Sequence, residues 1–223
     1  MLYNKIQGLP KRYLDASFEN FKINDENKKH YDSCKNWDGT DSMILTGNTG
    51  TGKTHLAISM LKTFPPVRLD EKDAEELKNK WENWLRYSSD ETKKPEIEKA
   101  LEEKRYEYRP PNLLFLPVVE MFIELNEAIR TDDGKKTLLD RYSSSFDCIC
   151  FDDFGAEKLT EAKKENFYYI IDRRYREMRP TIITSNFTIN EINQAEPRIA
   201  SRFAEMGNIL QFNGKDFRKS IRK

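Results

Sequence analysis

The stretch that decides the fold is residues 42–54, whose sequence is SMILTGNTGTGKT. Its first part, residues 42–46, is a short apolar run of the kind that forms a buried strand. From Gly47 onward the stretch matches the phosphate-binding pattern G-x-x-x-x-G-K-[ST] at every fixed position. A helix is predicted from Lys53, because apolar residues recur on one helical face until two prolines follow at positions 65 and 66. This order of strand, glycine loop and helix predicts a nucleotide-binding fold.

The residues of the glycine loop indicate how they would bind phosphate groups. Glycines let successive backbone N–H groups curl around the phosphates, and the positive end of the following helix dipole faces the same charges. We expect Lys53 to reach the β- and γ-phosphates of ATP and the Thr54 hydroxyl to bind Mg²⁺. A glycine-rich turn at a helix start is the alternative, which the flanking strand and helix disfavour. The expected nucleotide-binding residues are Gly47, Asn48, Thr49, Gly50, Thr51, Gly52, Lys53, Thr54 and His55.

Two carboxylates follow another apolar run, where a P-loop site needs an acidic group at the end of a neighbouring strand. Residues 148–153 are CICFDD, so four apolar residues precede Asp152 and Asp153. We expect Asp152 to hold Mg²⁺ through water, and Asp153 to orient or deprotonate the attacking water. An ordinary Asp-Asp turn after a strand is the alternative, and pairing with the P-loop makes it the weaker one.

A third strand end turns polar abruptly at Asn186. Residues 180–185 are PTIITS, an apolar strand pattern that ends in serine. An asparagine at this position is expected beside the γ-phosphate, where its amide can hydrogen-bond the attacking water. Asn186 capping the next turn is the alternative.

The rest of the chain alternates strand and helix patterns. Strands are predicted over residues 113–116, 146–151 and 181–184, and a helix over 161–176. Strands separated by helices imply βαβ units and a parallel sheet covered on both faces. We therefore predict an α/β P-loop core of about five parallel strands sandwiched by helices. The polar N-terminal segment, with its aromatic residues Tyr13, Phe18, Phe21 and Trp37, is predicted to be an arm along the domain edge.

One segment interrupts this alternation, between Pro66 and Pro110. It is dense in charge of both signs and carries Leu77, Trp81, Trp84 and Leu85 at helical spacing. Ile97, Leu101 and Tyr108 indicate a second helix after a turn, so the segment is predicted to be an inserted, projecting helical hairpin. Large aromatic residues at a surface are common binding anchors. Two hypotheses stay open: the hairpin recognises a partner, or it is a passive insertion with packed tryptophans.

Composition excludes several classes of protein. The 223 residues contain 38 Lys and Arg against 38 Asp and Glu, which excludes a globally basic nucleic-acid binder. No apolar run near the N-terminus predicts a secretory signal, and none approaches the ~20 residues that span a bilayer. Three cysteines cannot form a disulfide framework, and they lack zinc-site spacing. We expect a cytoplasmic protein with no membrane partner.

Several segments together resemble one family, the DnaC/DnaI helicase loaders and IstB transposition ATPases of the AAA+ superfamily. The run FDDFGAEK is more specific than either the P-loop or the acidic pair alone. The resemblance covers nearly the whole chain from Leu9 onward, apart from the charged insertion. The segments that carry it are LPKRYLDASFENF (9–21), GNTGTGKTH (47–55), FDDFGAEK (151–158), PTIITSNF (180–187) and RIASRFAEMG (198–207).

The resemblance implies an AAA+ ATPase in which residues 1–40 are an N-terminal arm or linker. Residues 41–223 would be the ATPase domain, with the helical insertion at about residues 67–110. The protein would hydrolyse ATP with Mg²⁺, form a homo-oligomer on binding ATP, and act in DNA replication on a replicative helicase. Because only about nine residues precede the segment of the arm that resembles the family, we expect the separate N-terminal helicase-binding domain of the loaders to be missing.

The resemblance also implies residue roles. Asp152 and Asp153 would be the Walker B pair and Asn186 would be sensor I. Arg202 matches the arginine finger, and Arg218 matches the sensor II position on the short match Asp-Phe-Arg.

The finger hypothesis has a physical basis of its own. An apolar stripe of Ile199, Phe203 and Met206 would face inward and leave Arg198 and Arg202 exposed. A finger that serves a neighbouring subunit must be reachable in the monomer. The alternative is a surface pair between Arg202 and its helical neighbour at position 205, worth well under ~1 kcal/mol.

Other functions are weighed against the loader. A transposition helper ATPase would differ only in its partner, a transposase. A small-molecule kinase would need an arginine-rich lid, and a non-hydrolysing adaptor would not need the acidic pair. Contact with single-stranded DNA is open, because a charge run is more often a solvated face than a binding surface. The basic residues considered for it are Lys158, Lys163, Lys164, Arg173, Arg174, Arg176 and Arg179.

Overall fold

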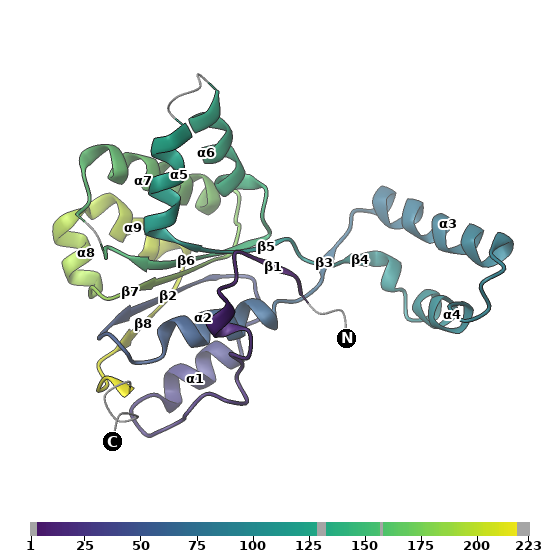
Figure 1. Cartoon of the computed structure of the whole chain (residues 1–223), viewed down its shortest axis with the longest axis horizontal. Helices are drawn as coiled ribbons and strands as arrows, with labels where there is room; N and C mark the ends of the chain where they lie inside the picture. The colour runs from purple at the N-terminus through teal and green to yellow at the C-terminus, as the bar shows by residue number, and fades with distance from the viewer. Residues whose placement is uncertain (1–3, 129–132, 157, 218–223) are drawn as a thin grey trace. The chain divides into compact units, whose positions relative to one another are not determined.

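The predicted parallel sheet is present in the computed structural model, which describes residues 4–128, 133–156 and 158–217. Within these residues six parallel strands pair in the order β1-β5-β6-β7-β2-β8 (Figure 1). The α/β prediction is confirmed, with six strands where about five were expected. The two edge strands, β1 and β8, were not among the strands predicted from the sequence. The strands are β1 (Ile6–Gln7), β2 (Ser42–Gly47), β5 (Leu113–Pro117), β6 (Cys148–Phe154), β7 (Thr181–Ser185) and β8 (Gly207–Phe212).

Helices cover both faces of this sheet, as its buried strands require. Figure 1 shows α1 and α2 on one face and α5, α6, α7 and α9 on the other. No helix of the described residues is long and apolar enough to cross a membrane. The helices are α1 (Lys28–Lys35), α2 (Lys53–Lys62), α5 (Val118–Ala128), α6 (Gly134–Ser144), α7 (Glu161–Arg176), α8 (Ile189–Ala195) and α9 (Pro197–Met206), with a 3₁₀ turn η1 (Lys11–Tyr13).

The strand order determines where the polar strand ends meet. β7 lies between β2 and β6, with Ile182 opposite both Met43 and Cys150. Because all three strands are parallel, their carboxyl ends emerge at the same edge of the sheet. The glycine loop, the two aspartates and the asparagine therefore follow neighbouring strands.

Aromatic side chains pack helices α7 and α9 against one face of the sheet. Phe154 at the end of β6 stacks on Phe167 of α7, with ring centroids 4.6 Å apart. Phe203 of α9 meets Phe154 edge-on at 5.8 Å. All three side chains are buried, so the apolar side of α9 faces the core, as the stripe in the sequence predicts.

The N-terminal arm contains a helix, α1, that the sequence pattern did not indicate. Its only buried residues are Tyr31 and Cys34, and one such pair is too short a stripe to stand out. Tyr31 packs edge-on against the buried Phe18 and stacks on Phe21, at centroid distances of 5.7 and 5.8 Å. Two of the predicted aromatic anchors thus meet on this helix.

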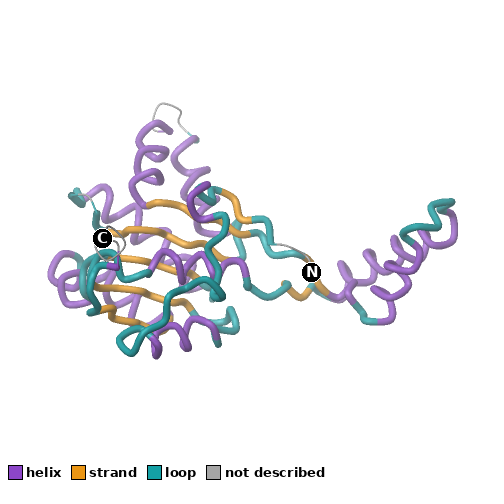
Figure 2. Tube along the Cα trace, turned by 60° about the horizontal axis from the view of Figure 1, so that its bottom comes forward, coloured by secondary structure: helices purple, strands orange, loops and turns teal. Residues whose placement is uncertain are grey.

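A second compact unit is formed by residues 65–111. It contains a hairpin of α3 (Glu71–Tyr87) and α4 (Lys94–Glu102), and the short antiparallel strands β3 (Val67–Arg68) and β4 (Tyr108–Arg109) close its base. The Asp70 side chain caps α3 by accepting from the Asp73 N–H at 2.8 Å. Trp81 and Trp84 are half-buried. Figure 2 shows the two helices of this unit running beside each other.

The second helix of the hairpin ends earlier than the sequence predicts. Tyr108 was expected on that helix and lies instead in β4, where it pairs with Arg68. Lys104 has a φ of 52°, a left-handed conformation that stops the helix. A 3₁₀ turn η2 (Arg105–Glu107) then leads into the strand.

Candidate functional site

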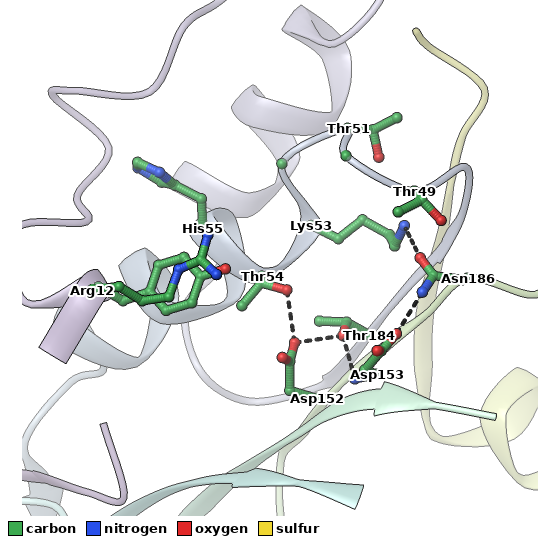
Figure 3. A pocket seen from close by; sticks show the side chains of 13 residues that line it. Arg12, Thr49, Thr51, Lys53, Thr54, His55, Asp152, Asp153, Thr184 and Asn186 are labelled. Carbon is green, nitrogen blue, oxygen red and sulfur yellow. Dashed lines mark hydrogen bonds between the residues drawn. The ribbon is translucent and has the colours of Figure 1, made fainter. Parts of the chain in front are cut away.

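The three strand ends surround a cavity of about 420 Å³ at the carboxyl edge of the sheet (Figure 3). The glycine loop follows β2, the aspartates end β6, and Asn186 follows β7. The arm adds residues from η1. The lining residues are Arg12, Tyr13, Thr49, Gly50, Thr51, Gly52, Lys53, Thr54, His55, Asp152, Asp153, Thr184 and Asn186.

Lys53 is held inside the glycine loop. Its buried Nζ donates to the carbonyl oxygens of Gly47 at 2.8 Å and Asn48 at 2.7 Å. It also donates to Oδ1 of Asn186 at 3.1 Å. Gly47 and Asn48 therefore contribute to the site through backbone oxygens that position the ammonium group.

Two glycines of the loop are required by its geometry. Gly50 and Gly52 have φ angles of 75° and 94°, in the left-handed region. A Cβ on Gly52 would lie 2.6 Å from the Phe21 ring, and one on Gly50 would lie 1.8 Å from an Asp216 carboxylate oxygen. Gly52 thus fits under the Phe21 ring of the arm, and Gly50 fits beside Asp216 near the C-terminus, both in a backbone conformation that favours glycine.

Asp152 lies between two hydroxyl groups. Its Oδ1 accepts from Thr54 at 2.8 Å and from Thr184 at 2.7 Å. Burial raises the pKa of this carboxyl group, and the two hydroxyl donors oppose the rise. A carboxylate beside a hydroxyl offers the hard oxygen ligands that Mg²⁺ prefers, with phosphate and water completing its shell. The donor set therefore fits the metal expected from the sequence.

Asp153 has an unusual backbone conformation. Its φ is 60°, and the β6–β7 register is interrupted between Phe151 and Phe154. Its N–H donates to the Thr184 hydroxyl at 2.8 Å, and its Oδ1 accepts from the Asn186 amide at 2.5 Å. A bulge next to a site can re-aim a side chain, and here the irregularity near the end of β6 separates the surroundings of two consecutive aspartates.

Sequence reasoning missed Thr184, Arg12 and Tyr13. Thr184 is buried and contacts both aspartates, and its signal was a hydroxyl residue near the end of an apolar strand. Arg12 and Tyr13 lie in the arm segment that carried part of the family resemblance, but no residue spacing connects them to the loop. His55, which was predicted, meets the carbonyl oxygen of Ser17 through Nε2 at 2.8 Å.

Arg202 lies outside this cavity, and the structure corrects the expectation that it is freely exposed. Its Nε donates to Asp172 at 2.9 Å and its Nη1 to Glu205 at 2.8 Å. Its guanidinium also lies 4.8 Å from the centre of the Tyr175 ring. The side chain is consequently only 25% exposed. The predicted sensor II residue, Arg218, lies outside the described residues.

Most of the basic residues considered for DNA contact are buried or paired with carboxylates. Arg174 is fully buried, which corrects its inclusion among them. Its guanidinium donates to the Thr181 hydroxyl at 2.8 Å and the Pro180 carbonyl oxygen at 2.9 Å, and burial lowers its pKa to about 10. Arg173 and Arg179 both pair with a carboxylate at position 177.

Half of the chain matches a known protein family. The family model described as "IstB-like ATP binding protein" matches residues 108–221, half of the chain. The match includes the aspartate pair and Asn186 and begins after the glycine loop. No curated protein sequence matches the chain.

Solved structures share the fold. A structure described as "DNA replication initiation factor" has a TM-score of 0.61 at 17% identity, over 96% of this chain and 54% of that one. The DnaC helicase loader has a TM-score of 0.59 at 21% identity, over 92% and 100% of the two chains. For DnaI the TM-score is 0.57 at 18% identity, over 94% of each chain. The chain thus spans about half the length of the first of these structures.

Proposed function

Because the chain belongs to the family of IstB-like ATP-binding proteins, we propose that it binds and hydrolyses ATP with Mg²⁺ and acts as a helicase loader in DNA replication. The observation that carries this proposal is the convergence of three strand ends on one cavity. Thr54 and Thr184 both donate to Asp152, while Asn186 bridges the loop lysine and the second aspartate. Groups suited to phosphate, metal and water lie within one site.

Nucleotide binding would use the Lys53 ammonium, which in this structure donates hydrogen bonds to carbonyl oxygens of the glycine loop. The Lys53 ammonium donates to two loop carbonyl oxygens, and it would exchange such contacts for oxygens of the β- and γ-phosphates. Thr54 and Asp152 would hold Mg²⁺, which when bound neutralises charge on the transferring phosphate. The backbone N–H groups at the start of α2 would hold the remaining phosphate oxygens.

Hydrolysis would depend on Asp153 and Asn186. The Asn186 amide donates to Asp153 at 2.5 Å, which orients the carboxylate at the cavity wall. Asp153 would orient or deprotonate the attacking water, and Asn186 would hydrogen-bond that water beside the γ-phosphate. Most of the catalysis would be positioning and electrostatic stabilisation.

Assembly would complete the site. Arg202 does not line the cavity of its own chain, so we assign it as a finger that enters the site of a neighbouring subunit when ATP brings subunits together. Asp172 and Glu205 hold its guanidinium in the single chain. Reaching the neighbour's γ-phosphate would require exchanging these carboxylates for phosphate oxygens.

The partner distinguishes two candidate functions. The fold shared with a DnaC helicase loader and with DnaI supports a replicative helicase as the partner, with single-stranded DNA as a further ligand. The family description favours a second candidate, a transposition helper that delivers a transposase to target DNA. The ATP chemistry is the same in both.

Steady-state ATP turnover tests the activity. The parent protein should release phosphate in the presence of Mg²⁺, more so with single-stranded DNA, and should elute as an oligomer with ATP. The variant Lys53→Ala, purified in parallel, should release no phosphate under either condition, because the loop keeps its glycines but loses its cation. Equal phosphate release by parent and variant would assign the activity to a contaminant. An inactive parent under all these conditions would refute the ATPase.

Partner capture tests the role. The parent protein, immobilised with ATP, is incubated with the purified replicative helicase or a transposase from the same genome. Capture of the helicase supports the loader, and capture of the transposase alone supports the transposition helper. Lys53→Ala again serves as the control, since nucleotide-dependent capture should be absent from it.

A further inference from the structure

Arg12 lies on the wall of the nucleotide cavity although it is distant from the glycine loop in sequence. It belongs to η1 and lines the cavity together with Thr54 and His55. Figure 3 shows it on the side of the cavity formed by these two residues, with the lysine and Asn186 on the opposite side. Together with Tyr13, the arm thus contributes a cation to a site whose other lining residues lie at or after the ends of strands β2, β6 and β7.

The arm is fastened on both sides of Arg12. Before it, β1 pairs with β5, and a Cβ on Gly8 would lie 2.3 Å from the Phe115 carbonyl oxygen. After it, the Lys62 ammonium at the end of α2 donates to the carbonyl oxygens of Leu14 and Ala16, at 2.6 and 2.7 Å. The position of η1 beside the P-loop helix is therefore determined by backbone contacts.

The guanidinium of Arg12 is available to an anion. Its side chain is exposed, and in the described part of the chain no carboxylate forms an ion pair with it. Its aromatic contact is the Tyr13 ring, 4.8 Å from the guanidinium carbon to the ring centre. Arg202 differs, since two carboxylates hold it. A cation–π contact leaves the N–H groups of an arginine free to donate.

Without Arg12, the cavity wall carries more negative than positive charge. Two carboxylates, Asp152 and Asp153, line the cavity, and Lys53 is the other permanently charged cation among its described lining residues. ATP with Mg²⁺ is still a net anion, so a wall with this excess of negative charge would oppose it. An arginine added to the wall offsets the excess, and its planar fork suits phosphate oxygens.

We propose that Arg12 is a nucleotide-binding residue: a second cation, supplied by the N-terminal arm, that contacts the polyphosphate of the bound nucleotide. This inference rests on the proposed ATP binding and adds a residue to it. By placing a phosphate contact on the arm, it also couples nucleotide binding to the arm's position on α2 and β5.

Titration calorimetry with Mg²⁺–ATP, Mg²⁺–ADP and AMP tests the proposal. Arg12→Ala should weaken ATP and ADP binding by about tenfold or more, since charge-assisted hydrogen bonds to phosphate are lost, and should weaken AMP binding less. Arg12→Lys should recover part of the affinity, because it restores the charge without the fork. The matched control is Lys11→Ala, an exposed neighbour that does not line the cavity, and it should bind like the parent.

The outcomes separate this inference from the function it rests on. If the parent binds ATP, Lys53→Ala does not, and Arg12→Ala retains parental affinity, the Arg12 inference is wrong and the P-loop assignment stands. An equal loss for ATP, ADP and AMP, together with a lower melting temperature without nucleotide, would assign Arg12 to arm structure instead. A parent that binds no nucleotide overturns both proposals.

Discussion

The nucleotide-binding core and the inserted hairpin are built in opposite ways. Each residue of β2 is buried, whereas the described helices α3 and α4 bury only Ala74 and Ala100. The hairpin instead carries exposed charge pairs, such as Lys78 with a carboxylate one turn away at 3.9 Å. Such pairs contribute only ~0.3–0.5 kcal/mol each. The core is specified by long-range burial, and the hairpin by local helix formation and capping.

This difference shows which part of the molecule can hold a catalytic or binding site. A site needs side chains held within a few tenths of an ångström by a packed surrounding, and the core supplies it through neighbouring strand ends. The hairpin buries few side chains, so substitutions in it should leave the geometry of the site unchanged.

The largest expected effect is the loss of ATP turnover in the variant Arg202→Ala. The variant should bind ATP like the parent and lose hydrolysis by about 10³–10⁵-fold, the contribution of an arginine finger. Mixing it with Lys53→Ala protein should partly restore turnover, because an intact finger and an intact loop then meet between subunits. Phosphate release at several mixing ratios measures this. Failure to restore turnover, with both variants still assembling, would contradict a role between subunits.

Asp153→Asn should bind ATP nearly as the parent does and hydrolyse it about 10²–10⁴-fold more slowly, because an amide cannot accept the proton of the attacking water. Calorimetry and single-turnover kinetics separate the two effects. The control is Asp140→Asn, a carboxylate that does not line the cavity. Turnover within a few-fold of the parent would move the catalytic role away from Asp153.

Arg174→Ala should lower the free energy of unfolding by about 3–5 kcal/mol, since it opens a cavity and leaves buried oxygens without a donor. Those oxygens include the Pro180 carbonyl and the Thr181 hydroxyl. Urea denaturation measures the change. Arg176→Ala, which loses one exposed pair with Asp172, is the matched control and should change stability by less than ~1 kcal/mol. Equal effects would refute a structural role for the buried guanidinium.

The smallest effect on the site is expected from removing the hairpin. Replacing residues 70–108 by a short Gly/Ser linker should leave ATP affinity within about twofold of the parent, because α2 ends at Lys62, before the deletion. Calorimetry measures this affinity, and a large loss would show that the core depends on the hairpin. Capture of helicase or transposase by the same variant decides whether Trp81 and Trp84 belong to a recognition element or to a passive insertion.

Much of the candidate site could be predicted because its residue types occur in fixed local order. The glycine loop, Asp152, Asp153 and Asn186 each stand where an apolar run ends, and the structure places them at one cavity. Strand and helix patterns of ordinary length were equally informative, as for α7, whose predicted bounds agree with those in the structure.

The sequence by itself thus determined the fold class and the residues at the strand ends, since both depend on neighbours in the chain. Only the tertiary structure decided that Thr184 joins the two aspartates, that Arg174 is buried, and that Arg12 reaches the cavity. Each of these depends on a contact between elements far apart in sequence. A threonine on a strand, or an arginine in a basic run, has the same local pattern whether or not another element packs against it.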